Sequence, residues 1–330
     1  MNPKASIIIL TYNQESTIAR AIESVLRQRC RYPFEILLAD DCSPDGTRGV
    51  AARYAEEYPD IVRLMPEHPN RGLVDNYFDA LQECRGEYIG DCAGDDEWLD
   101  DTRLERQIEI LDGDQTLSVV FTDVEELTID KDGKRHSRLN SSREDCRRWM
   151  RDRISGEEIT IGVLDNRRTL PFVLSSALYR KSALAKTLDV HPELVRIPEM
   201  GVEDVPVIAA LGRGGDAKYI PVAGYRYYID GESVSNNLSN EKEYSFYRRV
   251  LLGTSGIASG YGISASRLKG HYDMKLSHIA AQARHAGRKD LIPEIEATAK
   301  LLGTTLPLRA KLHLLLLRLG IYNITVRKKR

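Results

Sequence analysis

Two adjacent aspartates, Asp95 and Asp96, follow a short apolar run that we expect to be a buried strand. Neighbouring carboxylates at a strand end oppose each other's ionisation, so a bound divalent cation would stabilise the pair. A hard cation such as Mg²⁺ or Mn²⁺ prefers oxygen ligands and would also bridge the oxygens of a bound diphosphate. The alternative is a solvated acidic turn without a ligand.

A second acidic pair, Asp40 and Asp41, also stands at the end of an expected strand. A carboxylate in this place can accept a hydrogen bond from a base N–H or a ribose hydroxyl. The alternative is a structural role, because aspartate also caps helices and closes Asx-turns.

The third acidic pair, Glu203 and Asp204, opens an expected helix. A carboxylate beside an acceptor hydroxyl can remove its proton as the hydroxyl attacks, which is general-base catalysis. An aspartate with a reference pKa of about 3.9 is a weak base, so we expect proton transfer late in the transition state. Alternatively, both side chains only complement the helix dipole.

Alternating strand and helix patterns position these carboxylates. The expected strands are short and apolar, and they cover residues 6–10, 34–39, 61–65 and 87–92. Residues with helical spacing follow three of them, which predicts a parallel sheet with right-handed crossovers. Ligands of such sheets bind at the carboxyl ends of the strands, where the acidic pairs lie. Residues 128–135 are expected to form a hairpin, and residues 219–228 a late strand pair broken by Pro221.

The composition restricts the class of protein. Of 330 residues, 42% are hydrophobic and 29% charged, which is typical of a globular protein. A formal net charge of −2 gives no electrostatic footprint for nucleic acid. Five cysteines without a CxxC pair argue against a zinc site or a disulfide framework. Met1 leads directly into a strand, and no apolar stretch is long enough to span a bilayer, so we expect a cytoplasmic protein.

Five segments together resemble the family-two inverting glycosyltransferases with the GT-A fold. In the family's order and spacing they are residues 6–13, 21–28, 40–47, 86–89 and 94–98. The resemblance covers about residues 4–235. It implies an α/β fold of GT-A type, with a Rossmann-like, mostly parallel sheet flanked by helices. It also implies a catalytic domain over residues 1–235, to which we add a C-terminal helical region over residues 236–330.

The resemblance implies a role for several residues of the donor site. Tyr12 and the backbone of Leu10 would flank the nucleoside base. Asp41 would hydrogen-bond that base, with Asp40 supporting it. Arg71 lies where family members often place a nucleotide-binding side chain, although it is equally well explained as a surface arginine.

The family's DxD motif falls on residues 93–95 and is followed by Asp96. Its usual first aspartate is here Ala93, which puts the coordination geometry in doubt. We expect Asp96 to contact Mn²⁺ or Mg²⁺, and Asp95 to contact ribose or the metal. Asp204 would be the catalytic base. The residues expected near the acceptor are Glu203, Trp98, Ser175 and Ser176.

These roles predict an inverting, metal-assisted displacement. A sugar would pass from a nucleotide diphosphate-sugar, for which UDP is favoured, to a hydroxyl of a glycan or lipid-linked glycan. One alternative is a nucleotidyltransferase, although residues 10–14 lack the glycine-rich, lysine-containing phosphate loop of that class. The other is a non-catalytic carbohydrate-binding protein of the same fold, for which Ala93 is the only support.

The C-terminal segment allows two interpretations. Residues 307–319 are rich in leucine with interspersed basic residues, and the chain ends in Arg327-Lys328-Lys329-Arg330. Such a helix can lie on an anionic bilayer, as a peripheral contact at the inner face of the membrane. Alternatively, it packs on the catalytic domain or on a second subunit of a homo-oligomer.

Overall fold

The computed structural model describes residues 2–130, 132–165, 170–229 and 239–322. The chain divides into two compact units. Unit 1 comprises residues 1–163, 168–198 and 202–230, and unit 2 comprises residues 164–167, 199–201 and 231–330.

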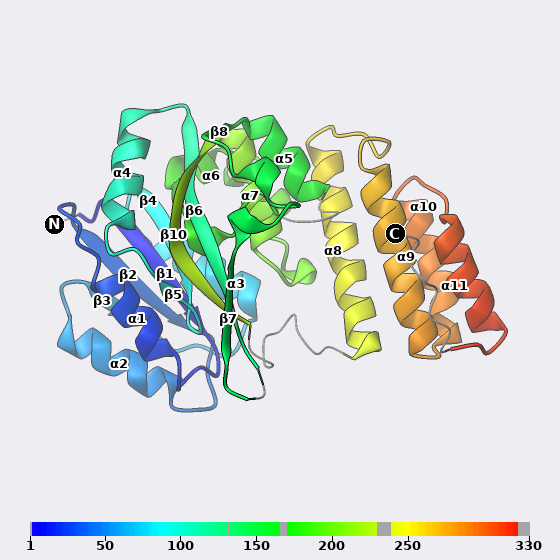
Figure 1. Ribbon diagram of the computed structural model, residues 1–330, viewed down its shortest axis with the longest axis horizontal. Helices are drawn as coiled ribbons and strands as arrows, with labels where there is room; N and C mark the ends of the chain where they lie inside the picture. Colours follow the sequence, from blue (N-terminus) through cyan, green and yellow to red (C-terminus); the bar gives the residue numbers. More distant parts are fainter. Residues whose placement is uncertain (1, 131, 166–169, 230–238, 323–330) are drawn as a thin grey trace. The chain divides into compact units, whose positions relative to one another are not determined.

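Unit 1 is built on one mixed sheet (Figure 1). Its strands run in the order β3-β2-β1-β4-β9-β6-β10-β5, with β7 paired to β6 and β8 to β10. Their bounds are β1 (Ala5–Thr11), β2 (Phe34–Asp40), β3 (Val62–Leu64), β4 (Tyr88–Ala93), β5 (Glu97–Trp98), β6 (Leu117–Ile129), β7 (Arg135–Leu139), β8 (Arg153–Ile154), β9 (Ala177–Arg180) and β10 (Asp216–Ile229). The first four strands pair in parallel, as do β6 and β10, while β9 is antiparallel to both β4 and β6.

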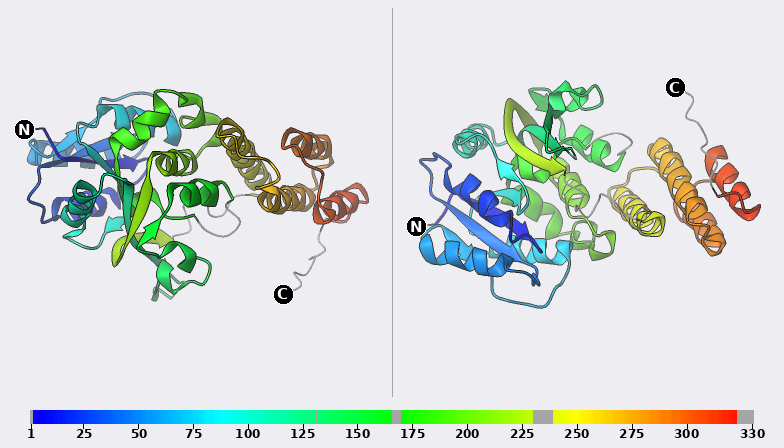
Figure 2. Two further views of the ribbon diagram at one scale, coloured as in Figure 1. Left: turned by 90° about the horizontal axis from the view of Figure 1, so that it is seen from above. Right: turned by 60° about the horizontal axis from the view of Figure 1, so that its bottom comes forward.

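Helices cover both faces of this sheet (Figures 1 and 2). The helices of unit 1 are α1 (Ile18–Leu26), α2 (Thr47–Glu57), α3 (Leu73–Glu83), α4 (Arg103–Gly113), α5 (Gly156–Leu164), α6 (Lys181–Leu188) and α7 (Asp204–Gly214). Short 3₁₀ helices are η1 (Asn140–Ser142), η2 (Arg147–Trp149), η3 (Leu174–Ser176), η4 (Pro192–Leu194), η5 (Pro198–Met200) and, in unit 2, η6 (Lys289–Leu291).

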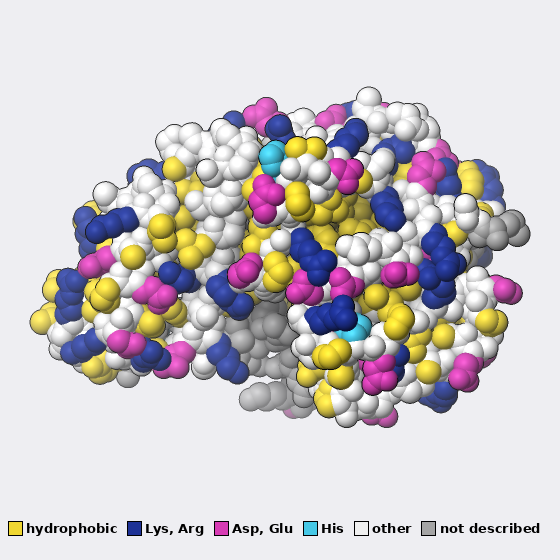
Figure 3. Space-filling model, turned by 180° about the vertical axis from the view of Figure 1, so that it is seen from behind, with side chains coloured by type: hydrophobic (Ala, Val, Ile, Leu, Met, Phe, Trp, Pro, Cys, Tyr) yellow, Lys and Arg dark blue, Asp and Glu magenta, His cyan; other side chains and the backbone are white. Residues whose placement is uncertain are grey.

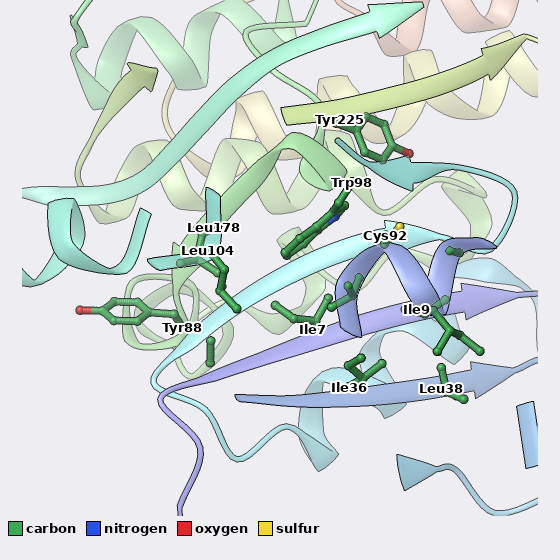
Figure 4. Close-up of a cluster of buried hydrophobic side chains, with 14 of the residues drawn as sticks. Ile7, Ile9, Ile36, Leu38, Tyr88, Cys92, Trp98, Leu104, Leu178 and Tyr225 are labelled. Atoms are coloured by element: carbon green, nitrogen blue, oxygen red, sulfur yellow. The ribbon is translucent and has the colours of Figure 1, made fainter. Parts of the chain in front are cut away.

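The main core lies between the sheet and helices α1, α2 and α4. Ile7 and Ile9 of β1 point into it together with Ile36 and Leu38 of β2 (Figure 4). The intervening residues point to the opposite face, because side chains alternate along a strand. Ile8 on that face is also fully buried, so both faces of the strand are covered, which explains why residues 7–10 at its centre are all apolar.

The predicted α/β fold class is confirmed. Two predictions about individual strands can also be compared with the structure. The expected hairpin over residues 128–135 forms, since β6 and β7 pair antiparallel with Ile129 opposite Arg135. The expected broken strand pair over residues 219–228 is instead one continuous strand, β10. Pro221 does not end this strand, because the pairing with β6 shifts register between Ile220 and Ala223 and so bypasses the missing N–H.

Unit 2 is helical. It contains α8 (Asn240–Gly260), α9 (Lys269–His285), α10 (Ile292–Leu301) and α11 (Leu308–Arg318). Helix α9 packs against α8, α10 and α11. On the face of the molecule drawn in Figure 3, acidic and basic side chains are interspersed, in keeping with the near-neutral composition.

His313 is a buried imidazole in the contact between α11 and the rest of unit 2. His313 is 7% exposed, and its Nδ1 has no hydrogen-bond partner among the residues that the structure describes. The pKa of His313 is lowered from 6.5 to about 4, mainly by burial. The nearby Arg284, His285 and Arg309 make smaller contributions to the same shift. The folded unit therefore holds this ring in its neutral form at pH 7.

Acid should destabilise unit 2 through His313. Because the pKa is lower in the folded state than in the unfolded state, the unfolded chain binds more protons between about pH 6.5 and pH 4. The free energy of unfolding should fall across this window, by on the order of 2–3 kcal/mol in total. Calorimetry at pH 7 and pH 4.5 should show a smaller loss for His313→Gln than for the wild type. The matched variant His191→Gln, at an exposed ring, should keep the wild-type loss.

Candidate active site

The carboxyl ends of β2, β1 and β4 form one edge of the sheet. In the register of these strands, Thr11 lies opposite Asp40, and Leu10 lies opposite Ala93. Backbone hydrogen bonds continue past the strand ends, from Asp41 N to Thr11 O (3.0 Å) and from Gly94 N to Leu10 O (2.9 Å). The two acidic segments predicted to share an edge are thus placed on either side of β1.

The loops that leave β1 and β2 have unusual backbone conformations. Asn13 (φ 58°) and Cys42 (φ 62°) are the non-glycine residues with positive φ in the described part of the chain. Asn13 N donates to Ser43 Oγ (2.9 Å), which ties the two loops together. Left-handed backbone at non-glycine residues is costly and gathers at functional sites.

Asp41 organises the loop before α3. Its two carboxylate oxygens accept hydrogen bonds from the backbone N–H groups of Arg71 and Gly72, both at 2.8 Å. His68 Nδ1 lies 4.0 Å from the same carboxylate. Asp40 accepts from the hydroxyl and the N–H of Ser43. Each oxygen of Asp41 keeps a second lone pair, so a further donor can be accepted.

Arg71 and Tyr12 differ in how they face this edge. The Arg71 guanidinium pairs with Asp79 of α3, so its side chain is engaged on the surface of that helix. Only its backbone N–H reaches Asp41. Tyr12 is 51% exposed, which leaves its ring open to a planar ligand.

Gly94 lies in a place that has no room for a side chain. An added Cβ would stand 2.4 Å from Gln14 Oε1 and 2.9 Å from Thr11 Oγ1. Neither of these two oxygens has a hydrogen-bond partner in the structure. The loop after β4 therefore packs directly on the loop after β1, and glycine permits this approach.

Asp96 is held by β10. It is 1% exposed, and its carboxylate accepts hydrogen bonds from the Tyr225 hydroxyl and from Tyr228 N (2.8 Å). Burial, and next the neighbouring charge of Asp95, raise the pKa of Asp96 to about 7. Both oxygens of Asp96 thus already accept a hydrogen bond from β10, which fixes the loop after β4.

Asp95 is the more accessible carboxylate of the pair. It is half-buried, and its carbonyl oxygen accepts a hydrogen bond from the Arg20 guanidinium, which stacks on the Tyr228 ring at 3.9 Å. No group of three His, Cys, Asp or Glu suited to a metal occurs among the described residues. One carboxylate still fits Mg²⁺ or Mn²⁺, because these ions are commonly held by one or two carboxylates together with the phosphates of a ligand.

Glu203 and Asp204 stand at the amino end of α7. Burial raises the pKa of Glu203 to about 8, with smaller contributions from Asp204 and from Asp91 of β4. Burial also raises the pKa of Asp204, whereas a hydrogen bond from Val205 N (2.7 Å) to its carboxylate favours the ionised form. Burial thus favours the protonated form of both groups, and the hydrogen bond from Val205 N favours ionisation of Asp204.

Asp91 is a buried carboxyl group that the sequence analysis did not single out. It is 7% exposed, neither oxygen has a hydrogen-bond partner within the described ranges, and burial raises its pKa to about 7. Its neighbour Cys92 points into the core beneath α1, so Asp91 points to the other face of β4. An aspartate inside an otherwise apolar strand was the available signal.

Three residues expected near the acceptor lie elsewhere. Trp98 is fully buried, donates from Nε1 to the Asp91 carbonyl (3.1 Å) and stacks against the Arg103 guanidinium (Figure 4 shows Trp98 within the core). Ser176 is fully buried, and its hydroxyl donates to Val173 O. The carbonyl of Ser175 accepts from Arg103. Trp98 and Ser176 thus pack the core and are closed to a ligand, which corrects the expectation for both.

A parallel sheet with acidic residues at its carboxyl edge, followed by an antiparallel extension, defines a protein of the GT-A class. The Glycosyl transferase family 2 model matches residues 6–188, and the chain belongs to that family. The predicted family is therefore confirmed.

Relatives and solved structures agree with this assignment. The chain is 29% identical over 248 residues to the succinoglycan biosynthesis protein ExoO of Rhizobium meliloti, covering 72% of this chain and 64% of that one. The structure of S. aureus TarS 1–349 in complex with UDP-GlcNAc aligns with a TM-score of 0.58 at 17% identity, covering 97% of this chain and 88% of that chain. The mannosyltransferase PcManGT of Pyrobaculum calidifontis, in complex with GDP-Man and Mn²⁺, aligns with a TM-score of 0.51 at 17% identity, covering 96% and 79%. At such identities the two structures establish the fold alone.

The sequence relatives are matched over part of their length. An uncharacterised protein of Mycobacterium tuberculosis is 37% identical over 132 residues, which is 40% of this chain and 38% of that protein.

Within the described ranges, no helix is both long and apolar enough to cross a bilayer. All five cysteines are free thiols.

Proposed function

We propose that this protein is an inverting glycosyltransferase that moves a sugar from a nucleotide diphosphate-sugar to a hydroxyl of a glycan or lipid-linked glycan. The observation that carries the proposal is the register of β2, β1 and β4. It gathers Tyr12, Asp41 and Asp95 at one edge of the sheet. UDP is the favoured nucleotide, in keeping with the UDP-GlcNAc complex of TarS.

The nucleoside would bind at the loops after β1 and β2. The exposed Tyr12 ring offers a stacking surface, and Asp41 has lone pairs free for a base N–H. The diphosphate would lie toward Asp95, which we propose as the metal ligand in preference to Asp96. A bound Mg²⁺ or Mn²⁺ would stabilise the charge that develops on the diphosphate as it departs.

Asp204 would remove the proton from the acceptor hydroxyl. The hydrogen bond from Val205 N favours its ionised form, and a protonated Glu203 beside it can donate a hydrogen bond to an acceptor oxygen. A base on the face of the sugar opposite the departing diphosphate leads to direct displacement and hence inversion at the anomeric carbon. Glu203 is therefore proposed as the acceptor-side donor, while the buried Trp98 and Ser176 have no direct part.

Thermal-shift measurements with UDP, GDP, dTDP and CMP, each with and without Mn²⁺, test the donor site. A ligand that binds only the folded state raises its stability, by about 2.7 kcal/mol at a hundred times its Kd. We expect one nucleoside diphosphate to stabilise the wild type in the presence of Mn²⁺ and to have little effect on Asp41→Ala. If all four nucleotides stabilise the protein equally and weakly, the proposal of a donor site at this edge of the sheet is wrong.

The two other functions considered from the sequence have less support. The family match does not favour a nucleotidyltransferase. The only support for a non-catalytic carbohydrate-binding protein is Ala93. Against it, the other acidic residues predicted for the carboxyl edge of the sheet do lie at that edge.

A further inference from the structure

The outward face of α11 carries leucines where a surface helix normally carries polar residues. Leu308, Leu312, Leu315 and Leu319 are 84%, 41%, 51% and 64% exposed. Their spacing of four, three and four residues places them on one face of the helix. The opposite face, formed by Ala310, His313, Leu314 and Leu317, is buried, and α11 packs on α9. The helix is therefore apolar on both faces, although only one face has a partner within the described part of the chain.

Basic side chains border this exposed leucine face on both sides. At 3.6 residues per turn, Arg309 lies along one border, and Lys311 and Arg318 lie along the other. All three are exposed, and Arg318 also pairs with Glu296 of α10 at 2.8 Å. Beyond Leu301 the sequence contains no Asp or Glu, but it contains seven basic residues: Arg309, Lys311, Arg318, Arg327, Lys328, Lys329 and Arg330. Because the whole chain has a net charge of −2, positive charge is concentrated at this end.

We propose that the leucine face of α11 docks on an anionic lipid surface. The four leucines would enter the boundary between headgroups and acyl chains, with the helix lying in the plane of the interface. Arg309 and Lys311 flank that face and would extend their charged ends to the lipid phosphates while their aliphatic stems stay with the leucines. The docking surface belongs to unit 2 and does not depend on the chemistry proposed for unit 1.

Charge complementarity favours lipid over a second copy of the chain. Two α11 helices meeting through their leucine faces would bring the basic borders of one copy toward those of the other. Helix α11 contains no acidic residue to compensate this repulsion. An anionic bilayer instead satisfies both the leucines and their basic borders.

Vesicle co-sedimentation of the full chain tests this proposal. The wild type should pellet with vesicles of phosphatidylcholine mixed with phosphatidylglycerol, much less with phosphatidylcholine alone, and less at high salt. Leu312→Ser/Leu315→Ser should weaken binding to the anionic vesicles by about tenfold or more, because apolar burial drives the insertion. Arg309→Glu/Lys311→Glu should abolish the preference for anionic lipid.

The control replaces two exposed apolar residues elsewhere. Ile129 and Val190 are 54% and 67% exposed in unit 1, so Ile129→Ser/Val190→Ser should bind as the wild type does. Circular dichroism should show folded protein in every variant, since all of the changed side chains are exposed. Failure of the wild type to pellet with anionic vesicles would overturn the proposal. So would light scattering that shows a wild-type dimer made monomeric by Leu312→Ser/Leu315→Ser, which would assign the face to a second copy.

Discussion

Asp204→Asn should abolish sugar transfer while leaving donor binding intact. The amide keeps the size and the hydrogen bond from Val205 N but cannot take up a proton. Removing a general base typically lowers the rate by about 10²- to 10⁴-fold. The metal-dependent thermal shift given by the nucleoside diphosphate should persist, because the proposed donor contacts lie at the ends of β1, β2 and β4.

Glu203→Gln is the matched control for this variant. Because the pKa of Glu203 is raised to about 8, the group is protonated at neutral pH, and glutamine reproduces that neutral form. We expect this change to cost about tenfold or less. In the wild type, activity should fall with decreasing pH as Asp204 becomes protonated. Because burial raises the pKa of Asp204, this loss should occur at a higher pH than the ordinary aspartate pKa of 3.8. If Glu203→Gln loses more activity than Asp204→Asn, then Glu203 is the base and Asp204 is the hydrogen-bonding partner.

Asp95→Asn should remove the metal dependence of donor binding. The amide is a poorer ligand for a hard cation, and Asp96 is covered by β10 and cannot substitute without movement. Titration calorimetry with the nucleoside diphosphate in the presence of Mn²⁺ should show binding weakened by about tenfold or more, which corresponds to about 1.4 kcal/mol.

Asp101→Asn provides the comparison for Asp95→Asn, because Asp101 pairs with Arg27 on the surface after β5. It should bind nucleotide as the wild type does. If Asp95→Asn also binds normally while Asp96→Asn does not, the metal ligand is Asp96, as the sequence alone had suggested.

The positions of the acidic segments could be predicted because they depend on local pattern. Continuous apolar runs identify β1 and β2, and the apolar spacing of Ile18, Ile22 and Val25 identifies α1, whose buried face they form. Once the strands are parallel, their carboxyl ends must share an edge, so Asp40 and Asp95 follow from topology without any knowledge of contacts.

The use of each side chain could not be predicted, because it depends on partners distant in the chain. Asp96 is engaged by Tyr225 and Tyr228, about 130 residues further along, and this pairing decides which aspartate of the pair is accessible. Trp98 looks like a ligand-binding aromatic beside an acidic motif, yet packing against Arg103 buries it completely. Asp91 gains its unusual environment only in the folded sheet, where its charge acts on Tyr77 of α3 and Tyr179 of β9.

Metal-dependent breakdown of a nucleotide-sugar, followed in wild type and in Asp204→Asn, tests the central claim most directly. With the nucleotide found by thermal shift, the wild type should release nucleoside diphosphate slowly with water as acceptor, only when Mn²⁺ or Mg²⁺ is present. The variant should release it at the rate of the enzyme-free blank. Release by the variant at the wild-type rate, or none by the wild type under any metal condition, would contradict the account.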